Sequence, residues 1–464
     1  MGLSTALNIA KSGLGVSAIR ADIISRNIAN AETAGYTRKT VAQTTDSTGG
    51  PKVTSIDRTV DALLDRLNLS NLSKVASTQT MADGMSAYTD YLGQPSDEIA
   101  PTKTLSDLNS AFVTLSSGVN TSASQLAALA SAQEMADHFN KLSGTLAEVG
   151  KEVEMNIRYD VADLNKALDA IASLNGKILL SGKGTVLTAE HQDEMGKLLE
   201  TVSSFLDIQT VTDQSGMVSV LTSGGTELVK GKVVHDVTYD GGAGTLMAGR
   251  VEITPDQGNR AFTSGSLYGL FSLKNETLPE FNLQLDTMAA AMIQSFEAAA
   301  PLGAAGLGLF TDAGTAYDPT NIAGMAARIR INTEVDPDQG GDVSLLQKGT
   351  NPARAPGDSS VVDAMLAIFS KPVGVPTGNL GSGDIVTLMA GMVSSQQMLR
   401  ADAQSNATAA ATSAATISAS RENLQGVNVD DELQKLLLVE QSYAANSKVL
   451  TTVTQMLDDL LAAV

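Results

Sequence analysis

Two heptad patterns at opposite ends of the chain most constrain its fold. In the last stretch, 426–464, seam residues recur every seven positions in two rows set three residues apart. One row is Leu436, Tyr443, Leu450 and Leu457, and the other is Val439, Asn446, Val453 and Leu460. An a/d pattern sustained over this length predicts a helix that packs in coiled-coil fashion along one face. Tyr443 is expected in that core, and the polar Asn446 is expected to set the register of pairing.

The first stretch carries a matching pattern. Its rows are Leu7, Leu14, Ala21 and Ile28, and Leu3, Ala10, Ser17 and Ile24, while Ile9, Val16 and Ile23 form a second apolar seam two residues on. This predicts one helix from Leu3 to Asn30 that is covered on more than one face. Gly13 and Gly15 each cost about 0.8–1 kcal/mol of helix propensity relative to Ala, so another backbone is expected to approach them closely. We expect the two ends to meet, with the middle of the chain inserted between them.

Neither end helix is expected to be stable alone. Ordering a backbone residue costs roughly 1–2 kcal/mol, and burying a large aliphatic side chain returns about 1.5–3 kcal/mol. The first seam offers Leu3, Leu7, Leu14, Ile24 and Ile28 for this purpose. We therefore expect the ends to be disordered or frayed in the monomer and ordered in an assembly. The alternative is a pair of ordinary amphipathic helices that close one globule.

Charges favour pairing of the two ends. Residues 1–44 carry five Lys or Arg against two acidic residues, and residues 426–464 carry two Lys against six acidic residues. Opposite signs speed association more than they add affinity.

The composition excludes several classes of function. The formal net charge of −20 argues against binding to nucleic acid or to an anionic membrane surface. The absence of Cys excludes disulfides, thiolate metal sites and Cys nucleophiles. The sequence contains no run of about 18 or more apolar residues, so no transmembrane helix is predicted. The N-terminus lacks the pattern of a cleaved signal peptide, so any export is expected to leave it in place.

The rest of the chain reads as mainly α with a small antiparallel β insertion. Helices are expected at 60–92, 105–115, 124–180, 188–205, 267–300, 360–369 and 383–424. An extended segment with a turn at 49–51 is expected at 40–58. Strands are expected at 208–211, 217–221, 226–230, 233–239 and 249–253, with one strand pair near 327–331. The expected domains are 1–44 and 426–464 as two parts of one terminal coiled-coil domain, 45–300 as a helical bundle with a β region at about 207–265, 301–356 as a small outer region, and 357–425 as returning helices.

Candidate chemical sites are weak, and we predict no cofactor, metal or catalytic set. His138, His191 and His235 are far apart in sequence, and His191 with Asp193 and Glu194 is at most a partial metal set. The Gly-rich run 182–185 lacks the spacing and the Ser or Thr of a phosphate loop and predicts a turn after a helix. Asp336, Asp338 and Asp342 resemble a calcium loop, but Gln347 replaces its bidentate Glu, so a turn is favoured.

Two long motifs resemble a known family. Residues 27–38 read NIANAETAGYTR, including Asn27, Asn30, Gly35, Tyr36 and Arg38. Residues 426–432 read GVNVDDE, with Gly426, Val427 and Asn428, and residues 440–450 read EQSYAANSKVL. These resemble the N- and C-terminal signatures of the bacterial flagellar rod, hook and hook-associated axial proteins. The Gly-Tyr-Thr-Arg loop, IASLNGKI at 171–178 and GSLYGL at 265–270 resemble the hook-associated member of the hook–filament junction.

The resemblance implies a structural, non-enzymatic protein that lies outside the cell in the flagellum. It implies export by the flagellar type III route without signal cleavage, with an export chaperone expected. It also implies assembly into a ring of about eleven copies per turn, with terminal helices lining the central channel as nested coiled-coil layers. The expected partners are further copies of the chain, the hook protein, and a second junction protein with flagellin on the filament side. The alternatives are a rod or hook protein, whose outer domains are mostly β, and an enzyme carried on a flagellar scaffold.

Overall fold

The computed structural model describes residues 2–47, 49–255, 261–374 and 381–462. The chain forms two compact units, each assembled from segments far apart in the sequence. Unit 1 contains Met1–Ser77, Arg158–Tyr268 and Thr408–Val464, and unit 2 contains Thr78–Ile157 and Gly269–Ala407. The division falls within four helices, α2 (Ala62–Leu92), α4 (Ser122–Ser181), α6 (Ser266–Ser272) and α11 (Ile385–Gln425). The mainly helical class with small antiparallel sheets is confirmed, whereas the finer domain boundaries stay a prediction.

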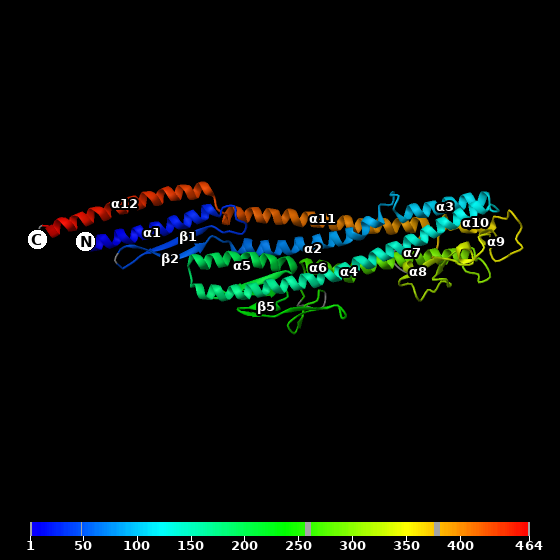
Figure 1. The fold of residues 1–464 in the computed structure, drawn as a ribbon, viewed down its shortest axis with the longest axis horizontal. Coiled ribbons are helices and arrows are strands. Elements are labelled where there is room, and N and C mark those ends of the chain that lie inside the picture. The colour runs from blue at the N-terminus through cyan, green and yellow to red at the C-terminus, as the bar shows by residue number, and fades with distance from the viewer. Residues whose placement is uncertain (1, 48, 256–260, 375–380, 463–464) are drawn as a thin grey trace. The chain divides into compact units, whose positions relative to one another are not determined.

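The two terminal stretches of unit 1 form helices that pack side by side. Helix α1 spans Leu3–Ala29 and helix α12 spans Val429–Ala462 (Figure 1). Both lack proline, and α1 ends at Asn30, whose side-chain amide donates to the carbonyl of Arg26. The prediction that the two ends meet is therefore confirmed within one chain. Disorder of these ends in the free monomer stays a prediction.

A β-hairpin follows α1. Strand β1 (Lys39–Thr45) pairs antiparallel with β2 (Pro51–Arg58). The turn between them is held by the Asp46 carboxylate, which accepts the amide of Gly50 at 3.0 Å. Gly49 has a φ of 86°, a conformation that favours glycine. The expected extended segment and its turn are confirmed, and the structure adds the pairing of its two halves.

Helices α4 and α5 (Val186–Phe205) are joined by the Gly-rich turn. Gly182 and Gly184 have positive φ, and the Thr185 hydroxyl accepts the amide of Thr188 as the N-cap of α5. Such an N-cap satisfies one of the amides left free at a helix start. The run 182–185 is thus a turn between two helices, as predicted.

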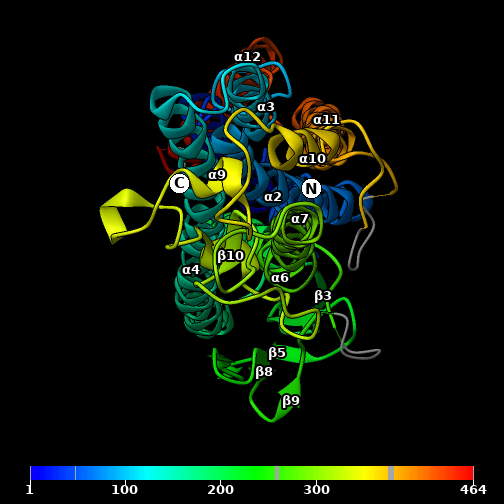
Figure 2. The same ribbon diagram turned by 90° about the vertical axis from the view of Figure 1, so that its right-hand side faces the viewer.

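The β region of unit 1 forms two small sheets instead of one. The first has the order β3-β4-β5-β6 and the second β7-β8-β9, and the segments that carry them lie together (Figure 2). The strands are β3 (Ile208–Thr212), β4 (Val218–Thr222), β5 (Glu227–Lys230), β6 (Val233–Val234), β7 (Val237–Asp240), β8 (Thr245–Ala248) and β9 (Val251–Glu252). Strand β8 was not predicted, because its short run between glycines lacks a clear alternation.

Two asparagines of α4 fasten these sheets to the helix. The Asn165 side chain accepts the amide of Val237 at 2.8 Å and donates to its carbonyl at 2.7 Å. The Asn175 side chain likewise accepts the amide of Val218 and donates to its carbonyl, and it also donates to the carbonyl of Gly231. A side-chain amide thus takes the place of a neighbouring strand at each of these residues.

In unit 2 the expected helix at 267–300 contains a π-helical turn. Helix α6 (Ser266–Ser272) leads into the π-turn η1 (Leu273–Thr277), and α7 (Leu278–Ala299) follows. Pro279 explains the change, because proline lacks an amide hydrogen and its ring crowds the carbonyl four residues earlier, here that of Asn275. A wider turn relieves that crowding while the helix continues.

Phenylalanines join the outer region to the helices of unit 2. The Phe296 ring of α7 lies 5.0 Å from Phe310, 6.0 Å from Phe112 and 6.3 Å from Phe369, measured between ring centroids. The elements here are α3 (Pro101–Ser117), β10 (Phe310–Asp312), α8 (Met325–Arg328), β11 (Ile329–Ile331), η2 (Pro337–Gln339), α9 (Leu345–Lys348) and α10 (Ser360–Ala367). The strand pair expected near 327–331 exists, and β10 is the partner of β11.

Candidate assembly site

The register of the terminal pair is fixed by two contacts. The Asn27 amide nitrogen Nδ2 donates to Glu432 Oε2 at 2.9 Å. Asn446 lies against Gly13, where an added Cβ would come within 2.9 Å of its Nδ2 and Oδ1. These positions lie fourteen residues apart on each helix, in opposite directions. Helices α1 and α12 are therefore antiparallel, and the spacing equals two heptads, as a coiled-coil seam requires.

The predicted seam residues divide by exposure. Ala10, Ile24, Val439 and Val453 are buried. Leu3, Leu7, Leu14, Ala21, Ile28, Leu436, Asn446, Leu450 and Leu457 are partly buried. Tyr443 and Leu460 stay 49% and 55% exposed, so within this chain Tyr443 is not a core residue. A single helix covers α12 along one stripe, and these two side chains lie outside that stripe.

The prediction that another backbone approaches Gly13 and Gly15 is wrong within this chain. Gly13 is buried and closely approached, although by the Asn446 side chain and not by a backbone. Gly15 is exposed, and no atom lies within 4 Å of the place a Cβ would take. Close approach inside the chain therefore explains only the first of the two.

Asn27 is the hub of the site. Its side chain is 1% exposed and uses every hydrogen bond it can make. Nδ2 donates to Glu432 and to the Lys39 carbonyl, each at 2.9 Å. Oδ1 accepts the Lys39 amide at 3.0 Å and the Tyr36 hydroxyl at 2.9 Å. One side chain thus joins the C-terminal helix, the signature loop and the first strand.

A buried ion cluster continues from this hub. The Lys39 side chain is 1% exposed, and its Nζ lies 2.7 Å from Asp193 Oδ2 on α5 and 3.6 Å from the centroid of the Tyr36 ring. Asp193 Oδ1 also accepts Arg58 Nε at 2.7 Å and the Thr37 hydroxyl at 2.5 Å. Burial raises the pKa of Tyr36, and the nearby Asp193 carboxylate adds to the effect. Tyr36 therefore stays a neutral hydrogen-bond donor.

The other N-terminal signature residues shape the loop between α1 and β1. Gly35 has a φ of 74°, and a Cβ there would come within 2.7 Å of Lys197 Cε, so this position requires glycine. Arg38 donates its backbone amide to the carbonyl of Gln425, at the end of α11, at 2.8 Å. Its backbone carbonyl accepts the amide of Thr59. The loop is thereby joined to the segment that leads into α12.

The C-terminal signature forms the short link between α11 and α12. The Gly426 amide donates to the carbonyl of Glu422, and a Cβ on Gly426 would collide with that carbonyl. Val427 is partly buried in the link. The Asn428 side chain caps α12, since its Oδ1 accepts the amides of Asp430 and Asp431 at 3.0 and 3.2 Å.

Sequence reasoning missed Lys39, Asp193 and Glu432 as site residues. Glu432 lies seven residues before Val439, so it extends the seam row that contains Val439 and Asn446, and it is 2% exposed. A charged residue at a seam position was a usable signal, because such a residue needs a specific partner. Lys39 and Asp193 carried no such signal, since their pairing depends on the fold.

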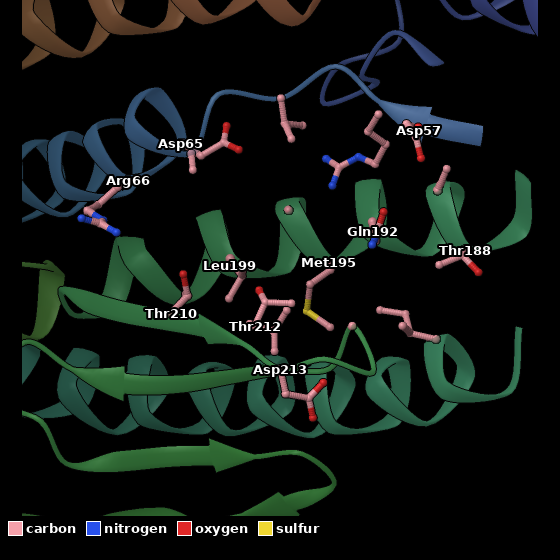
Figure 3. Close-up of a pocket in the computed structure, with 18 of the residues that line it drawn as sticks. Asp57, Asp65, Arg66, Thr188, Gln192, Met195, Leu199, Thr210, Thr212 and Asp213 are labelled. Carbon is pink, nitrogen blue, oxygen red and sulfur yellow. The ribbon is translucent and has the colours of Figure 1, made fainter. Parts of the chain in front are cut away.

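Unit 1 contains a cavity of about 630 Å³. It lies between the start of α2, α5, and β3 with the turn after it, and Figure 3 shows Asp65, Met195 and Thr210 along these walls. Three of its charged groups are engaged with one another, because Arg421 pairs with Asp65 at 2.9 Å and with Glu200. The Asp213 carboxylate accepts the Ser215 hydroxyl and the backbone amides of Ser215 and Met217, and these hydrogen bonds lower its pKa.

The weak metal motifs are structural. Asp193 is occupied by Lys39 and Arg58, and in the described part of the chain no three His, Asp or Glu side chains gather as a metal site would need. Asp336 Oδ1 accepts the amide of Asp338, and Gln347 donates to the carbonyls of Ala355 and Asp358. This segment is a turn, as predicted. Over the described residues, none of the helices has the length and apolar character needed to cross a membrane.

Comparison with known families agrees with this geometry. The model named Flagellar hook-associated protein FlgK helical domain matches residues 85–316, half of the chain. Residues 424–463 match the Flagellar basal body rod FlgEFG protein C-terminal model, and residues 7–37 match the Flagella basal body rod protein model. The two terminal matches cover the paired helices α12 and α1.

Individual relatives show the same likeness. Flagellar hook-associated protein 1 of Bacillus subtilis is 22% identical over 511 aligned positions, covering 99% of this chain and 97% of that protein. The proteins of the same name from Salmonella typhimurium and Escherichia coli are 24% and 23% identical, covering 64% and 63% of this chain but only 56% of each relative. A structure of the flagellar hook junction protein FlgK from Burkholderia pseudomallei aligns with a TM-score of 0.44 at 19% identity, over 53% of this chain and 46% of that one.

Rod-type terminal helices placed around an inserted helical domain define an axial structural protein of the bacterial flagellum. The rod-type ends are common to that class, so the helical domain decides between its members. The chain belongs to the flagellar hook-associated protein FlgK family. The family is structural, which settles the choice against an enzyme, and the helical domain settles it against a rod or hook protein.

Proposed function

We propose that this protein joins the hook to the flagellin filament by polymerising through its terminal helices. About eleven copies per turn form a short ring, with the hook protein on one side and a second junction protein and flagellin on the other. The chain leaves the cell by the flagellar type III route with its N-terminus intact, and a chaperone protects its C-terminal helix beforehand.

The exposed apolar side of α12 supports polymerisation most directly. Of this helix, only Glu432, Val439 and Val453 are buried in the chain. Large apolar residues on the rest of it stay exposed: Leu433, Leu437, Leu438, Val449, Met456, Leu460 and Leu461. Apolar surface of this kind marks a protein–protein contact, because water disfavours it. Further copies stacked beside the helix pair would cover it.

Deleting residues 431–464 tests the proposal. We expect the truncated chain to stay soluble, because the core residues of α4, α7 and the β region lie elsewhere. We also expect it to lose assembly, because α1 then has no partner. A truncated chain that still caps hooks and supports filament growth would contradict the proposal.

Microscopy of cells that lack this protein separates a junction protein from other axial proteins. Bare hooks, with flagellin released into the medium, are expected for a junction protein. Loss of the hook itself would instead place the protein earlier in the structure.

A further inference from the structure

We propose that the contact of Asp193 on α5 with Lys39, called the lock below, controls whether the terminal helices α1 and α12 are ordered. The proposal deepens the proposed function and rests on it, because it names the contact that controls whether the assembly surface is ordered. Asp193 lies outside both terminal stretches and outside both signature motifs. Its role would be that of a positioning residue, acting through Lys39 and Asn27.

A continuous chain of contacts runs from α12 to α5. Glu432 accepts a hydrogen bond from Asn27, and Asn27 pairs with both backbone groups of Lys39. The Lys39 side chain then reaches Asp193. Lys39 is therefore held from both sides, by its backbone on the helix pair and by its ammonium group on α5. If the Lys39–Asp193 ion pair is broken, the backbone of Lys39 is a less fixed partner for Asn27, and the converse also holds.

Burial distinguishes this chain of contacts from ordinary surface pairing. The Lys39 and Asp193 side chains are 1% and 10% exposed, and Arg58 is 17% exposed. Three residues earlier on α5, Glu190 offers a natural comparison. It pairs with Arg26 of α1 at 3.1 Å, and the two side chains are 45% and 46% exposed. Exposed pairs contribute little to stability, whereas removal of one partner of a buried pair is costly.

Charge explains why this carboxylate is suited to the role. Asp193 faces two cations, Lys39 and Arg58, and the Thr37 hydroxyl. Replacement by Asn keeps the shape but leaves two cations near each other without a counter-charge. Because Lys39 is buried, it cannot turn to solvent without moving β1, and β1 is tied to Asn27. The expected consequence is loosening of β1 first and of α1 and α12 with it.

The test is hydrogen exchange on the full-length monomer with millisecond labelling, so that weakly protected amides remain measurable. We expect Asp193→Asn to speed exchange roughly tenfold or more in 39–45 and in 429–439, within the usual 5–150-fold range of coupling between sites. Exchange over the middle of α4 should not change. The matched control Glu190→Gln should change exchange in these segments by less than about threefold.

A double-mutant cycle separates coupling from local damage. Glu432→Gln on α12 should also speed exchange in 39–45, and its effect should be smaller in the Asp193→Asn background. Adding Lys39→Met to Asp193→Asn should restore part of the protection, because it removes the unpaired buried cation. Thr37→Val deletes one bond to the same carboxylate and should give a weaker shift in the same direction, which keeps the test valid if Asp193→Asn does not fold.

Unchanged exchange over α12 in both Asp193→Asn and Thr37→Val would overturn the lock. So would strictly additive effects of Asp193→Asn and Glu432→Gln. Both results concern the monomer alone, so they would leave the proposed role at the junction standing. Conversely, coupling in the monomer with no effect on assembly would count against the proposed function and not against the lock.

Discussion

The side-chain amide of Asn446 lies over Gly13, so close that a Cβ at position 13 would come within 2.9 Å of both its Nδ2 and its Oδ1. The polar seam residue of one terminal helix thus matches the smallest residue of the other. The Asn27–Glu432 hydrogen bond lies two heptads away along the same helix pair, so both contacts belong to one register. Slippage by one turn would bring a larger side chain under the amide.

Two glycine substitutions on α1 should therefore differ in effect. Gly15→Ala should stabilise the helix by about 0.8–1 kcal/mol, since the position is exposed and open. Gly13→Ala should gain nothing or lose stability, because Asn446 must move away. Thermal unfolding of the monomer, followed by exchange over α1, measures both. Equal stabilisation by the two variants would show that the Asn446–Gly13 contact does not matter.

Asn446→Leu should strengthen pairing while loosening register. Leucine adds apolar contact against α1 but gives up the polar residue that distinguishes one register from the next. Slower exchange over α12 would report the first effect. Crosslinking between single cysteines placed on α1 and α12, in a chain that has no cysteine of its own, would report the second. A single crosslinked register in the variant would contradict the prediction.

Asn27→Asp should disrupt the hub strongly. The change removes both donors of a side chain that is 1% exposed and places a second carboxylate against Glu432. We expect a loss of about 3 kcal/mol or more in the stability of the terminal pair, because buried groups lose their partners. Asn30→Asp is the control, since the Asn30 side chain bonds only the Arg26 carbonyl and the Thr33 hydroxyl, both near solvent. Denaturant titration monitored on the terminal segments should separate the two variants clearly.

The terminal helices should be the least protected helices of the dilute monomer. We expect fast hydrogen exchange over 1–40 and 430–464 and slow exchange over α4, because few side chains of α12 are buried. The order seen in the paired helices is then completed by assembly. Strong protection of both ends in the monomer would instead favour two ordinary helices that close one globule.

His138 should make unit 2 sensitive to mild acid. Burial lowers the pKa of His138, and the neighbouring Lys141 adds to the effect. The folded chain thus binds this proton less readily than the unfolded chain, so its stability should fall as the pH drops below about 6.5. His138→Gln should flatten the fall in melting temperature between pH 7 and 5, and Lys141→Gln should lessen it. An identical slope in the His138 variant would exclude this group as the cause.

The helices were predictable because their signals are long. Helix α4 shows three- and four-residue apolar steps without proline, and its predicted and observed ends agree within two residues. The pairing of α1 and α12 followed from two heptad patterns and opposite charge, whereas its antiparallel direction is known only from the structure. The π-turn before Pro279 was not predicted, because the sequence alone shows a continuous helical pattern there.

The candidate site was only partly predictable. The signature marked Asn27, Gly35 and Tyr36, and the structure brings Asn27 and Tyr36 into contact. It did not reveal Asp193, which lies in a different element and meets Lys39 only through tertiary folding. The heptad pattern predicts that Tyr443 is buried, but a single partner helix leaves it 49% exposed.

Three asparagines on helices of the described chain each hydrogen-bond both the amide and the carbonyl of one strand residue. The pairs are Asn27 with Lys39, Asn165 with Val237 and Asn175 with Val218. An open strand edge invites another chain to add itself as the next strand, which is how fibrous aggregates grow. If the chain is exported and polymerises through its helices, as we propose, it gains from keeping this second mode of polymerisation closed. The amides of Asn27 and Asn165 occupy the place that a foreign strand would take on the edge strands β1 and β7, whereas Val218 lies in β4, between β3 and β5.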